Sequence, residues 1–121
     1  MIDLNGLCKV ALANAEQRQK NGGHIKSDTR SMLKHCATEV VEAAEANLDL
    51  MMYKSQVDSS WTDRDADNWL EKPRERFASE LADIICCVLI IAGKEGIDIE
   101  TAVNECVEKN RKLAKGTGDK L

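Results

Sequence analysis

The feature that most constrains the fold is a run of nine residues without a polar side chain, residues 84–92. Nine residues are about half of what a membrane span requires, so we expect a buried segment of a folded domain. A helix that is apolar on every side must be buried on every side. A chain of 121 residues has few other helices to enclose such a segment, so the run predicts an all-α core and at least a dimer.

Two pairs of acidic residues stand at helical spacing. Glu39 and Glu42 are three residues apart, and so are Glu80 and Asp83, which immediately precede the apolar run. On helices each pair projects its carboxylates from one face. Carboxylates crowded at the edge of a core raise one another's pKa unless a cation neutralises them. We therefore expect the two pairs to converge on Mg²⁺, with Mn²⁺ as a substitute, because both ions prefer oxygen ligands.

The alternative for the first pair is a solvated acidic stripe, of the kind that is common on helix surfaces. Glu45 and Asp49 continue the face of Glu39 and Glu42, as such a stripe would. The second pair lies beside the apolar run and favours the metal.

The apolar spacing predicts four helices, no strand and one domain over residues 1–121, arranged as a four-helix bundle. Asn21 and two glycines stop the first helix, Ser27 or Asp28 caps the second, and Glu95-Gly96 ends the third. Asp98 caps the fourth. The expected helices span residues 3–20, about 28–54, 73–94 and 98–114, with a loop over residues 55–72 and a loose tail over 115–121.

Composition excludes several classes of partner. A net charge of −4 without a basic cluster argues against nucleic acid. The five cysteines are odd in number and lack C-x-x-C spacing, which favours buried thiols in a reducing cytoplasm over disulfides or a zinc site. We expect no membrane span and no signal peptide, hence a cytoplasmic domain. His24 and His35 stand alone and are expected in a loop and on a helix surface.

The acidic pairs occur in a wider context that resembles a known family. Six residues separate Lys72-Pro73 from the second pair, and a Gly-Ile-Asp turn at residues 96–98 leads into a last helix that carries Asn110-Arg111. Over about residues 29–112 this combination is similar to the MazG-like all-α NTP pyrophosphohydrolases.

The resemblance implies a helical bundle that forms a homodimer or tetramer. It also implies Mg²⁺-dependent cleavage of an NTP or dNTP, between its α and β phosphates, to the monophosphate and pyrophosphate. Asn110 maps onto a substrate-contacting residue. Members often carry a Lys where this chain has Cys106, so the phosphate contact is expected from Lys109, Arg111 or a residue elsewhere. The metal ligands that it implies are Glu39, Glu42, Glu80 and Asp83.

The water that attacks phosphorus needs a carboxylate to orient it or to accept its proton. Glu42 and Glu45 are both candidates, and the sequence does not choose between them. The long polar loop carries Trp61 and Trp69, which we expect to stack on the base of the nucleotide as the loop closes. The other explanation for these indoles is that they anchor the loop to the helices or pack against a partner subunit.

Three other functions compete with this one. Phosphoribosyl-ATP pyrophosphohydrolase is a related activity with the same fold and metal chemistry. A non-catalytic helical dimerisation module would need no metal. A di-iron carboxylate bundle needs Glu-x-x-His motifs on two helices, and neither histidine follows a Glu by three residues.

Overall fold

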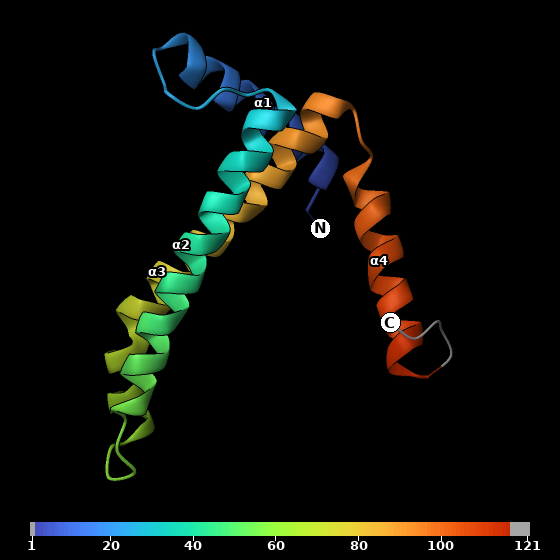
Figure 1. Cartoon of the computed structure of the whole chain (residues 1–121). Coiled ribbons are helices and arrows are strands. Elements are labelled where there is room, and N and C mark those ends of the chain that lie inside the picture. The colour runs from blue at the N-terminus through green and yellow to red at the C-terminus, as the bar shows by residue number, and fades with distance from the viewer. Residues whose placement is uncertain (1, 117–121) are drawn as a thin grey trace. The chain divides into compact units, whose positions relative to one another are not determined.

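The computed structural model describes residues 2–116 and contains four helices: α1 (Leu4–Lys20), α2 (Thr29–Ser55), α3 (Asp63–Glu95) and α4 (Ile99–Ala114) (Figure 1). No strand occurs in this part of the chain, which confirms the all-α prediction. Most of the tail predicted to be loose, residues 117–121, lies outside the described residues.

The predicted N-cap at Asp98 is confirmed, and Asp3 caps α1 in the same way. The Asp3 side chain accepts a hydrogen bond from the Gly6 backbone N–H at 2.9 Å, and Asp98 accepts one from the Thr101 N–H at 3.1 Å. Each bond satisfies a backbone donor that the first helical turn leaves without a partner.

The predicted end of the third helix is also confirmed. Gly96 has φ +64°, and the next N–H, that of Ile97, donates to the Ala92 carbonyl at 2.9 Å. The Gly96 N–H reaches the Gly93 carbonyl at 3.4 Å, which completes a Schellman motif. Glycine suits this position because the left-handed conformation has no Cβ penalty there.

The predicted start of that helix was wrong: α3 begins at Asp63, so the loop over residues 55–72 shortens to residues 56–62. A capping box begins the helix, because the Asp65 N–H donates to Thr62 Oγ1 at 3.1 Å and the Thr62 N–H donates to Asp65 Oδ2 at 3.2 Å. Pro73 lies inside α3 and costs one backbone hydrogen bond. Its ring is buried three residues after buried Leu70, so packing compensates for that loss.

The chain divides into two compact units, and α3 contributes to both. The first comprises Met1–Thr29 and Leu89–Leu121. Its core is a cluster of Cys8, Leu89 and Ala92, against which Ala11 and Ile99 pack. At Gly93 a Cβ would lie 2.8 Å from the Cys8 carbonyl oxygen, so the close approach of α1 to this part of α3 depends on the missing side chain.

The second unit, Arg30–Val88, is an antiparallel helical hairpin (Figure 1). Asp49 of α2 forms an ion pair with Arg76 of α3, and further toward the turn the Trp69 indole N–H donates to the Tyr53 carbonyl at 3.0 Å. From the first pair to the second, the residue number rises on α2 and falls on α3, as expected for antiparallel helices. The buried side chains of α2 recur with helical spacing at Met32, Glu39, Ala43, Ala46 and Leu50.

The sequence predicted that the apolar run is buried on every side. Within one chain it is only partly buried. Cys87, Ile90 and Ala92 are buried, but Ile85 is 57% exposed and Val88 39%. Within the hairpin α3 has a single partner helix up to Val88, so the hairpin itself covers only one face of that stretch.

The cysteines differ in burial, which corrects the expectation that all would be buried. Cys8 and Cys87 are buried and Cys36 is half-buried, whereas Cys86 and Cys106 are exposed. Burial raises the pKa of the Cys87 thiol to about 11, with the neighbouring Cys36 adding to the effect. That thiol is therefore a poor nucleophile.

None of the described helices is long and apolar enough to cross a membrane.

Candidate metal centre

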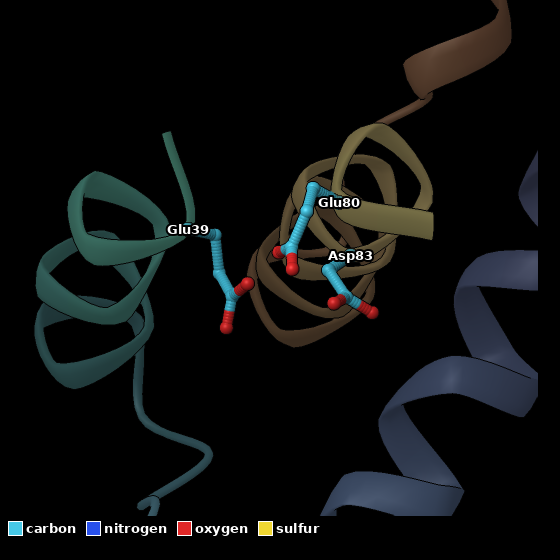
Figure 2. A group of neighbouring side chains, drawn as sticks. All are labelled: Glu39, Glu80 and Asp83. Carbon is cyan, nitrogen blue, oxygen red and sulfur yellow. The ribbon is translucent and has the colours of Figure 1, made fainter. Parts of the chain in front are cut away.

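Three carboxylates from the two helices of the hairpin meet. Glu39 projects from α2 toward α3, where Glu80 and Asp83 project from one side of the helix (Figure 2). One oxygen from each lies within 4.8 Å of the others. These side chains meet because they lie at nearly the same distance from the turn of the hairpin. Glu39 lies 16 residues before the end of α2 at Ser55, and Glu80 lies 17 residues after the start of α3 at Asp63.

The three carboxylates differ in burial. Glu39 is only 8% exposed, Glu80 is half-buried and Asp83 is exposed. The Oε2 atoms of Glu39 and Glu80 are buried and accept no hydrogen bond within the described residues. A buried polar atom without a partner costs free energy of about 1–3 kcal/mol. A cation bound by these carboxylates would remove that cost.

His35 holds the other oxygen of Glu39. Its Nε2 lies 2.9 Å from Glu39 Oε1, one helical turn away, and the imidazole is half-buried. His35 is thus not isolated, contrary to the expectation from the sequence, although its spacing of four residues from Glu39 was a usable signal. A histidine that orients a ligating carboxylate is a common supporting feature of metal sites. His24 is exposed in the loop after α1, as expected.

The electrostatics of the cluster favour proton or cation binding. Burial raises the pKa of Glu39, and repulsion from Glu42 and Asp83 raises it further, against the lowering effect of His35. Burial likewise raises the pKa of Glu80, with Glu42 and Asp83 contributing. Glu42 therefore lies close to both, although its own side chain is exposed. Of the four predicted ligands, Glu39, Glu80 and Asp83 form one group, and Glu42 lies at its edge.

The donor set fits a hard divalent cation. Carboxylate oxygens are the ligands that Mg²⁺ and Mn²⁺ prefer, and no thiol or imidazole nitrogen belongs to the group of three. Two oxygens on one Mg²⁺ at ~2.1 Å lie at most ~4.2 Å apart. A spread of up to 4.8 Å therefore needs only a fraction of an ångström of side-chain movement.

The other predicted site residues lie elsewhere. Glu45 is exposed on α2, three residues beyond Glu42. The three predicted substrate contacts of α4 belong to the first unit and are exposed: Lys109, Asn110 and Arg111.

Two of these α4 residues already have partners within the helix. Arg111 forms an ion pair with Glu108. The Asn110 amide lies 3.9 Å from Cys106 Sγ. Neither interaction prevents a phosphate contact, since all of these side chains are exposed.

Trp61 and Trp69 are near each other but not near the carboxylates. Trp69 precedes Glu80 by 11 residues on α3, which corresponds to ~16 Å along the helix axis. The loop that was expected to carry both indoles over the nucleotide places Trp69 inside a helix instead.

Comparisons with known proteins add no assignment. Neither the models of known protein families nor the curated protein sequences gave a match. The resemblance to the MazG-like enzymes therefore stays a prediction.

Proposed function

We propose that this protein is a Mg²⁺-dependent nucleoside triphosphate pyrophosphohydrolase of the MazG-like type, which converts an NTP or dNTP to the monophosphate and pyrophosphate. The observation that carries the proposal is the acidic cluster. It combines carboxylates from two helices with two buried oxygens that have no hydrogen-bond partner in the part of the chain that the structure describes. Such a site suits a cation that also binds phosphate oxygens.

Within this function the residues have separate tasks. Glu39, Glu80 and Asp83 hold the cation, and His35 fixes the orientation of Glu39. A cation bound there would neutralise charge on the triphosphate and lower the pKa of a coordinated water. Glu42 borders the cluster and is exposed, which suits a base that meets water from solvent. Glu45, one turn further along, is the alternative base.

Pyrophosphate release from a panel of nucleotides tests the proposal. We expect Glu80→Gln and Asp83→Asn each to lower Mg²⁺-dependent turnover at least about 100-fold while the helical content is kept, because each removes a metal ligand. Glu105→Gln, which changes an exposed acid of α4, serves as the matched control. Turnover close to that of the unchanged protein in both variants would rule out this metal site.

The panel and a binding control separate the alternatives. Phosphoribosyl-ATP belongs in the panel, since its hydrolysis needs the same metal chemistry. A non-catalytic helical module is distinguished by melting temperature, because Mg²⁺ that binds only the native state raises it and a solvated acidic stripe barely responds.

We also infer a homodimer, formed through one face of the hairpin. On both helices, exposed apolar side chains occupy the positions one residue after those that face the partner helix. One residue corresponds to ~100° of rotation about the helix axis. Because the helices are antiparallel, the same rotation brings both rows to the same face. This apolar strip consists of Leu33, Val40 and Met51 on α2 and Leu81, Ile85 and Val88 on α3. A row of exposed apolar side chains along one face of a hairpin is typical of an interaction site.

A further inference from the structure

Three of the four aromatic residues of the chain gather where α2 turns into α3. The rings of Tyr53 and Trp69 have centroids 4.9 Å apart, and Trp61 meets Trp69 edge to face at 6.0 Å. Both indoles keep a large exposed surface, 36% for Trp61 and 38% for Trp69. The cluster therefore presents aromatic surface to solvent.

The two indoles line a pocket of about 370 Å³ together with Asp65 and Asn68. This volume lies in the range of small-molecule sites, which combine apolar walls with a few polar groups. None of the four lining residues is cationic. The pocket therefore offers nothing to hold a phosphate and suits the base end of a ligand.

Structural roles explain only part of the arrangement of the aromatic cluster and its pocket. Trp69 packs on Tyr53 and donates to its carbonyl, which anchors the turn, and Asp65 Oδ2 belongs to the capping box. The indole N–H of Trp61 has no such bond within the described residues. A ring that serves only as an anchor would be expected to lie deeper.

The chemistry of the lining selects the ligand. Indole faces stack on any flat aromatic ring. Asp65 only accepts hydrogen bonds when ionised, whereas the Asn68 amide both donates and accepts. Together they match the edge of a base that carries an exocyclic amino group, such as adenine or cytosine, where that amino group lies beside a ring nitrogen acceptor.

We propose that the pocket formed by Trp61, Asp65, Asn68 and Trp69 is a nucleobase site for bases with an exocyclic amino group, such as adenine or cytosine, separate from the acidic cluster. The ~16 Å along α3 between Trp69 and Glu80 separates the two sites within one chain. Base binding here needs neither the cation nor catalysis, so the inference stands independently of the proposed function.

Nucleosides without phosphates test the site directly. Adenosine, cytidine and uridine are titrated into the full-length protein with EDTA present, and tryptophan fluorescence and calorimetry follow binding. We expect saturable binding of adenosine or cytidine, with weaker binding of uridine, which lacks the amino group. Trp61→Ala, with Trp69 as the remaining reporter, is expected to weaken binding about 5- to 150-fold, the effect of losing one stacked base.

Two further variants keep the outcome decisive. Asn68→Ala leaves the aromatic cluster intact and is expected to weaken binding about tenfold through the lost hydrogen bonds. Glu80→Gln is expected to bind nucleosides as the unchanged protein does, even if it has lost all turnover. Absence of saturable binding of any nucleoside to the folded protein would overturn the proposal. So would equal affinity for uridine, or loss of binding in Glu80→Gln.

Discussion

At the scale of the residue, Glu39 shows how a fold sets the chemistry of one side chain. Burial raises its pKa, and so do the carboxylates of Glu42 and Asp83. The pKa of Glu80 is likewise raised by burial and by the carboxylates of Glu42 and Asp83. In the absence of a cation the folded protein therefore holds protons that the unfolded chain releases near pH 4.5.

This proton balance predicts how stability depends on pH. Between the unfolded pKa near 4.5 and the raised folded pKa the native state binds more protons, so the free energy of unfolding falls as pH rises through that window. Glu39→Gln removes one of the crowded charges and is expected to raise stability in EDTA at neutral pH by about 1 kcal/mol. Urea unfolding at pH 5 and pH 7.5 measures both effects. A Glu39→Gln protein less stable than the unchanged one in EDTA at pH 7.5 would contradict this account.

At the scale of the element, the start of α3 decides where the acidic residues meet. The capping box of Thr62 and Asp65 begins the helix ten residues before Pro73 and gives the two arms nearly equal length. Without it the first turns of α3 would fray, because their N–H groups would lack partners.

Removing the cap should therefore destabilise the hairpin. Thr62→Ala is expected to cost about 1 kcal/mol in the free energy of unfolding. Thr62→Ser keeps the hydroxyl and should lie within a few tenths of a kcal/mol of the unchanged protein. Urea titrations followed by circular dichroism compare the two variants. Equal loss in both would show that the methyl group, and not the cap, stabilises this end of the helix.

At the scale of the whole molecule, the apolar strip predicts the oligomeric state. Ile85 lies in the strip and is 57% exposed, so Ile85→Glu places a charge where a second copy would pack. We expect at least about tenfold weaker dimerisation, because a buried charge without a partner is costly. Cys86→Glu puts the same charge ~100° further round α3, at another exposed position, and is the matched control. Light scattering at micromolar concentration reports the mass, and a stable monomer of the unchanged protein would rule out the dimer.

The sequence by itself determined the helical content, the acidic pairs and every helix boundary, within one residue, except the start of α3. Each depends on signals that act within one or two turns, such as the Asp98 cap and the Gly96 terminus. The signal for the early start of α3 is also local, because it lies in the Thr62-x-x-Asp65 pattern of a capping box. The polar composition of residues 55–72 and the presence of Pro73 favoured a loop instead.

Only the tertiary structure decided which side chains share a site. The meeting of Glu39 with Glu80 depends on the lengths of both arms and the turn between them, and an error of ten residues in one arm moves a side chain by ~15 Å. For the same reason the sequence could not show that Trp69 lies far from the carboxylates, nor which side of the apolar run α2 leaves open. Local signals specify where a helix begins and ends, whereas the partner of each of its faces is set by packing between segments that are distant in the chain.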